Sequence, residues 1–94
     1  MIANIRRSAP MRYNIGDRVC QTGYRGKERN YGTVIAAGFR DHMVRAYPQY
    51  FNYSDPNPNQ IVYVVRWDVG EISGANDYDP RLWSESEGLS ISVE

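Results

Sequence analysis

The one histidine and the one cysteine, His42 and Cys20, are the side chains of this sequence best suited to covalent chemistry. A cysteine beside a histidine forms a nucleophile–base pair, but only where the fold brings the two together. A lone cysteine more often behaves as a small buried hydrophobe. Two residues are also too few for a zinc site, which takes three or four protein ligands. We therefore expect no enzyme, no metal and no cofactor, and we expect the function to lie in binding.

The first candidate binding segment is residues 22–32, which we predict to be an exposed loop because it is rich in glycine and charge. Its basic and aromatic side chains alternate closely. Such a mixture suits the stacking of nucleic-acid bases, a protein-interaction hot spot or an aromatic cage for methylated lysine or arginine. The candidate residues are Tyr24, Arg25, Lys27, Arg29 and Tyr31.

The second candidate segment is a long loop, residues 40–60, which holds four aromatic rings and three prolines. Its rings either cover the sheet or contact a partner. Phe51 has no hydroxyl to satisfy, so we predict that it covers the sheet. Tyrosine tolerates being half exposed, so we predict that Tyr50 and Tyr53 contact a partner. Tyr47 precedes a proline and is expected to be extended, with its direction open.

The elements that position these segments are predicted to be strands. The strongest is Ile61–Trp67, in which only Arg66 interrupts the β-branched and aromatic residues. The five predicted strands comprise residues 18–21, 33–39, 61–67, 71–75 and 89–94. The last of them alternates strictly between apolar and polar residues, as a strand with one buried face does. Residues 41–46 are the one helical candidate and are too short to stand alone, and residues 80–83 could form a single 3₁₀ turn.

The strongest strand predicts what must lie on each of its faces. We assign Tyr63, Val65 and Trp67 to the interior, so that Val62 and Val64 point outward. Two outward valines on a central strand need a cover, and a ring of the preceding loop could supply it. Burying one such ring stabilises the fold by about 1.5–3 kcal/mol.

The motifs YNIGDRV, YGTVIAAGF and VYVVRWDVG resemble the SH3-like small-barrel group. The shared elements are a G-x-x-V start, a G-x-V second strand and a Y-x-V-x-W-D-x-G third strand and turn. Similar layouts occur in the hemimethylated-DNA-binding (YccV-like) family and in Mind-bomb/HERC-type and Tudor-like domains. The resemblance covers roughly residues 13–82 and implies an all-β fold, a small five-stranded antiparallel barrel with one long aromatic loop. It also implies that ligands lie across the two loops named above.

The totals fit one small domain. The chain has 94 residues, and we expect a peripheral N-terminal segment, residues 1–11, followed by the barrel domain, residues 12–94. No apolar run approaches the ~20 residues of a membrane span, and a single cysteine excludes an intramolecular disulfide. These features predict a cytoplasmic protein with no membrane contact.

The net charge of zero conceals an uneven distribution. Residues 1–45 hold nine basic and three acidic side chains, giving +6, and residues 46–94 hold two basic and eight acidic ones, giving −6. The split indicates a basic binding face, or else two halves that interleave and neutralise each other.

Our leading hypothesis is a small adaptor or regulator that binds another protein through its aromatic and basic loops, as a monomer or weak homodimer. The alternative is a nucleic-acid-binding module that uses the basic first half and stacks bases on its tyrosines.

Overall fold

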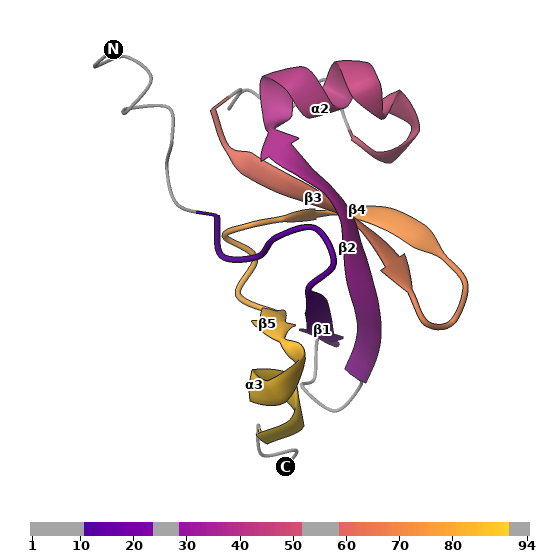
Figure 1. Ribbon diagram of the computed structural model, residues 1–94, viewed down its shortest axis with the longest axis vertical. Helices are drawn as coiled ribbons and strands as arrows, with labels where there is room; N and C mark the ends of the chain where they lie inside the picture. Colours follow the sequence, from indigo (N-terminus) through magenta and orange to yellow (C-terminus); the bar gives the residue numbers. More distant parts are fainter. Residues whose placement is uncertain (1–10, 24–28, 52–58, 91–94) are drawn as a thin grey trace.

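The computed structural model describes residues 11–23, 29–51 and 59–90 and shows a mostly β protein. Its core is one antiparallel sheet with the strand order β4-β3-β2-β1-β5 (Figure 1). The strands are β1 (Arg18–Thr22), β2 (Arg29–Phe39), β3 (Ile61–Trp67), β4 (Ile72–Asn76) and β5 (Leu82–Ser84). The helical elements are α2 (Arg40–Ala46), the 3₁₀ turn η1 (Pro48–Tyr50) and α3 (Glu85–Ser90).

Strand β3 is buried on both faces over residues 61–65, which explains the unbroken apolar sequence of these five residues. Tyr63, Val65 and Trp67 belong to a cluster on the inner face of the sheet, whereas Val62 and Val64 belong to a cluster on the outer face. The predicted assignment of the two faces is therefore confirmed. The inner cluster comprises Tyr13, Val19, Val34, Ile61, Tyr63, Val65, Trp67, Ala75 and Leu82. The outer cluster comprises Ala36, Met43, Phe51, Val62 and Val64.

Strand β2 is longer than predicted and begins at Arg29 instead of residue 33. The prediction of an exposed loop over residues 22–32 is wrong for its last part, because Arg29 pairs with Thr22 and Tyr31 pairs with Cys20 across the β1–β2 ladder. The polar composition of this part hid its pairing. Gly32 is required here, since a Cβ atom would lie 2.8 Å from the Arg66 carbonyl oxygen on β3.

Helix α2 is the segment predicted to be too short to stand alone, and packing is what supports it. Met43 is only 2% exposed and lies in the outer cluster. Arg40 is also buried, and its Nη2 donates to Asn76 Oδ1 on β4 at 2.6 Å. The helix is therefore attached to the sheet by its first residue, Arg40, and by Met43 at its middle.

The C-terminal prediction needs correction. Residues 89 and 90 belong to α3 instead of a strand, and residues 91–94 lie outside the described part. The fifth strand is β5, where a 3₁₀ turn was expected, and it pairs with β1. A capping box starts α3: Ser84 N–H donates to Glu87 Oε1 at 3.1 Å, and Glu87 N–H donates to Ser84 Oγ at 3.2 Å.

Both helices lie against the outer face, at opposite ends of β2 (Figure 1). Val19 points into the inner cluster, so its neighbour Cys20 faces outward. Gly88 of α3 packs on that thiol, because a Cβ atom at position 88 would lie 2.5 Å from Cys20 Sγ. Among the residues that the structure describes, no helix has the length and apolarity to cross a lipid bilayer.

Candidate protein-interaction surface

A rim of two half-buried tyrosines borders the outer cluster. We call residues 47–50 the tyrosine rim. Tyr47 N–H donates to the Met43 carbonyl at 2.8 Å, and Tyr50 N–H donates to the Tyr47 carbonyl at 3.0 Å, so local turns fix both residues. Their rings pack partly against the outer cluster and remain partly exposed. Within the described chain, neither phenol hydroxyl has a hydrogen-bond partner.

Phe51 follows the rim and completes the cover of β3, as predicted. It is 9% exposed and packs in the outer cluster with Val62 and Val64. The prediction that Tyr50 contacts a partner remains a prediction, although its half-exposed position is compatible with one. Tyr47 lies in the same half-buried position, and Tyr53 lies outside the described residues.

The rim is seated directly on strand β4. A Cβ atom at Gly74 would lie 2.6 Å from the Phe51 ring and 2.7 Å from the Tyr50 carbonyl oxygen. Only glycine leaves room for this approach. The Arg40 guanidinium lies 5.9 Å from the centre of the Phe51 ring, a distance at which cation–π attraction operates.

The other predicted surface is only partly described. Tyr24, Arg25 and Lys27 lie outside the described residues. Arg29 Nε donates to the Gly88 carbonyl of α3 at 3.1 Å. The half-buried Tyr31 pairs on β2 with Cys20, the residue on which Gly88 packs. The rim follows the far end of β2, up to about 33 Å away at ~3.3 Å per residue. The described residues of this surface, Arg29 and Tyr31, thus lie apart from the rim.

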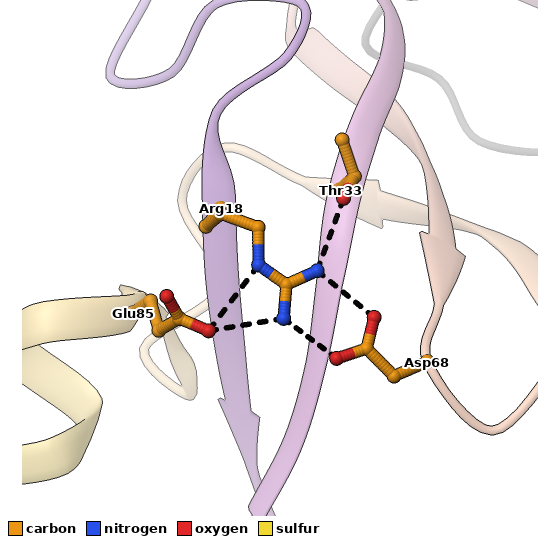
Figure 2. A network of polar contacts seen from close by, with 4 residues as sticks. All are labelled: Arg18, Thr33, Asp68 and Glu85. Atoms are coloured by element: carbon orange, nitrogen blue, oxygen red, sulfur yellow. Dashed lines mark hydrogen bonds and ion pairs between the residues drawn. The ribbon is translucent and has the colours of Figure 1, made fainter.

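A charged network that the sequence analysis missed joins distant parts of the chain (Figure 2). The Arg18 guanidinium forms a bidentate pair with Asp68, with Nη–Oδ distances of 2.9 and 2.6 Å. It also donates to Glu85 at 3.0 Å and to Thr33 Oγ1 at 3.1 Å. These hydrogen bonds raise the pKa of Arg18 and lower the pKa of Asp68. In this network, an arginine of the basic first half of the chain is neutralised by two carboxylates of the acidic second half. Only the strand register reveals that these residues meet.

An open groove beside this network is lined by charges that already have partners. The Arg12 guanidinium donates to the carbonyls of Asp77 and Leu82 at 2.6 and 2.9 Å, and to the hydroxyl of Tyr13 at 2.7 Å. The lining residues are Arg12, Tyr13, Asp17, Arg18, Ser84, Glu85, Ser86 and Glu87. Because both arginines are engaged, the groove offers little spare positive charge to an anion.

The candidate nucleophile and base are not brought together. Cys20 is buried on β1 under α3, and burial raises the pKa of its thiol. His42 is exposed on α2, at the opposite end of the sheet (Figure 1). In the described part of the chain, no three histidine, cysteine or acidic side chains are placed to hold a metal ion.

No protein-family model matches the chain, and no curated protein or solved structure is significantly similar to it. The resemblance to SH3-like barrels therefore rests on the sequence motifs alone.

Proposed function

We propose that this protein is a non-enzymatic binding module that contacts another protein through the tyrosine rim. The observation that carries the proposal is that adjacent aromatic rings differ in burial. Phe51 alone is buried at the centre of the cover, whereas Tyr47 and Tyr50 leave part of each ring exposed beside it. Half-exposed tyrosines on a rigid support are typical of interaction hot spots.

The test separates binding from folding. Tyr47→Ala and Tyr50→Ala are compared with Ile15→Ala, a control at an exposed apolar residue in the turn before β1. We expect each tyrosine variant to weaken capture of the partner from the native host by 1 kcal/mol or more, as at a hot spot. Unchanged capture in both tyrosine variants would contradict the proposal.

The nucleic-acid alternative has less support. Among the described basic side chains, Arg18 is neutralised by two carboxylates and Arg29 is bonded to α3. Replacing Arg25, Lys27 and Arg29 together by serine would abolish nucleic-acid binding, and that binding would fall steeply with salt. If the wild-type protein binds neither DNA nor RNA at low salt, this alternative is excluded.

We also propose that the sheet belongs to the SH3-like small-barrel group. Three features support this proposal: the five antiparallel strands, the enclosed inner cluster, and the irregular register of β2 between Val34 and Ala36. Such an irregularity bends a strand, as the curved sheet of a small barrel requires. An experimental structure in which the sheet stays flat at Val34 and leaves the inner cluster open to solvent would contradict it.

A further inference from the structure

Strand β4 is an edge strand, and the hydrogen bonds at its two ends fix which of its backbone groups face outward. Trp67 N–H donates to the Glu71 carbonyl at 2.8 Å, and Asp77 N–H donates to the Ile61 carbonyl at 3.0 Å. In an antiparallel ladder the bonded positions alternate. Ser73 therefore bonds to β3, as does the equivalent position 75.

The alternate positions of β4 turn their amide groups away from β3. These are Ile72, Gly74 and Asn76. Within residues 11–23, 29–51 and 59–90, the N–H and C=O groups of Ile72 and Gly74 have no hydrogen-bond partner. The Asn76 carbonyl accepts from Asp79 N–H at 3.1 Å, which leaves its N–H facing outward. We call these groups the β4 edge.

The β4 edge lacks the features that usually protect a sheet edge. Proteins blunt such edges with lysine, proline, bulges or very short strands. The sequence of β4, ISGAN, has neither charge nor proline, and its pairing with β3 is regular. The opposite edge differs, because β5 has three residues and leads directly into α3, which packs on β1.

The charge beside the β4 edge indicates the chemistry of its occupant. Residues 67–80 contain four carboxylates and no lysine or arginine. Of these, Asp68 is paired with Arg18 and Asp79 with Arg81. Asp77 accepts from the backbone N–H of Arg12. Glu71, just before β4, is exposed. A segment that carries lysine or arginine opposite Glu71 would complement this end of the strand.

A second copy of the chain fits this edge less well than a single foreign strand does. Two antiparallel β4 strands centred on Gly74 would place Glu71 of each copy opposite Asp77 of the other, and like charges in such positions are destabilising. Each copy would also bring its own tyrosine rim over the adjoining strands, since the rim lies directly on Gly74.

We propose that the β4 edge binds an extended, basic segment of a partner protein by strand addition. The proposal rests on the proposed function, and it names the partner's chemistry. The added strand would exchange hydrogen bonds with Ile72 and Gly74, while its side chains on the outer face meet the rim at Tyr50.

The first test selects short random peptides displayed on phage against the immobilised full-length protein. We expect the selected peptides to be rich in lysine, arginine and β-branched residues and poor in proline. Their affinity should fall about tenfold in Ile72→Pro, which loses an outward N–H, relative to Ile72→Ala, which keeps it. Proline is tolerated on an edge strand where its nitrogen faces solvent. Equal affinities in the two variants, or no selected peptide, would overturn the proposal.

The second test uses the wild-type protein, so it does not depend on the folding of a variant. Amide hydrogen exchange with a selected peptide bound should slow at Ile72, Gly74 and Asn76 and stay unchanged at Ser73. Slowing confined to the tyrosine rim would overturn strand addition and leave the proposed function standing. Sedimentation of the protein alone supplies a further outcome: a dimer that dissociates in Ile72→Pro would show that a second copy occupies the edge and would overturn the proposal.

Discussion

Phe51→Ala should destabilise the protein by about 3 kcal/mol, because Phe51 closes the outer cluster. The side chain is 9% exposed, and an aromatic residue buries about 150–250 Å². At about 25 cal/mol per Å², that area corresponds to roughly 4–6 kcal/mol as an upper bound. Measured Phe→Ala changes lie at about 3–5 kcal/mol. Met43, a flexible neighbour in the same cluster, can move into part of the space, so we expect the lower end.

Urea unfolding followed by tryptophan fluorescence measures this loss, and a thermal melt should show a decrease in Tm of roughly 12–24 °C. Phe51→Leu is the matched control and should lose much less. Gly74→Ala extends the test, since its methyl group would lie 2.6 Å from the Phe51 ring. This substitution should cost less in the Phe51→Ala background than alone. A Phe51→Ala variant within about 0.5 kcal/mol of wild type, as for a surface change, would refute the assignment of Phe51 as the cover.

Three further predictions concern the inner cluster and the ionised groups. Trp67→Ala should destabilise by about 3–5 kcal/mol, since Trp67 is 5% exposed and donates to Ser73 Oγ; an unchanged urea midpoint would contradict this. Arg18 lowers the pKa of Asp68, so the pair's contribution is present above about pH 4 and lost as the pH falls through the folded pKa. The stability gap between wild type and Asp68→Asn should therefore narrow in acid, and a constant gap would count against the pair. Burial and the hydrogen bond to a carboxylate raise the pKa of Tyr63, so its contribution to stability is complete below about pH 10, the unfolded pKa, and is lost as the pH rises through the higher folded pKa. Denaturant titrations should show the stability difference between wild type and Tyr63→Phe closing only in strong alkali.

Strand β3 and its cover could be predicted because the physical signal is local. The run Ile61–Trp67 has the predicted bounds, and five adjacent buried residues require packing on both faces of the strand. Phe51 was the one ring nearby without a hydroxyl, so its burial followed from its chemistry.

Other parts of the fold could not be predicted because their signals were weak or depended on long-range register. Strand β5 has three residues, too few to show a period of two. The tail alternates apolar and polar residues, yet Leu89 belongs to a helix. The capping box of Ser84 and Glu87 was a readable sign of that helix.

The charged network and the β4 edge required the three-dimensional arrangement. Arg18 meets Asp68 and Glu85 over separations of 50 and 67 residues, and no local pattern announces such contacts. The outward amides of β4 follow from its place in the sheet, whereas the absence of charge and proline in ISGAN was visible beforehand.

The position of β1 between β2 and β5 has a consequence for how the protein is made. Strand β2, the first neighbour of β1, follows it directly in the chain, but β5, its second neighbour, is the last strand. Glu85, which pairs with Arg18, lies 67 residues later in the chain. At a synthesis rate of ~5–20 residues per second, the ribosome adds Glu85 roughly 3–13 s after Arg18. During that interval the nascent chain carries β1 with one flank unpaired and with Cys20 uncovered by α3. Chaperones that bind emerging chains can therefore protect β1 during this interval. The interval ends when β5 and α3 leave the ribosome and cover the strand.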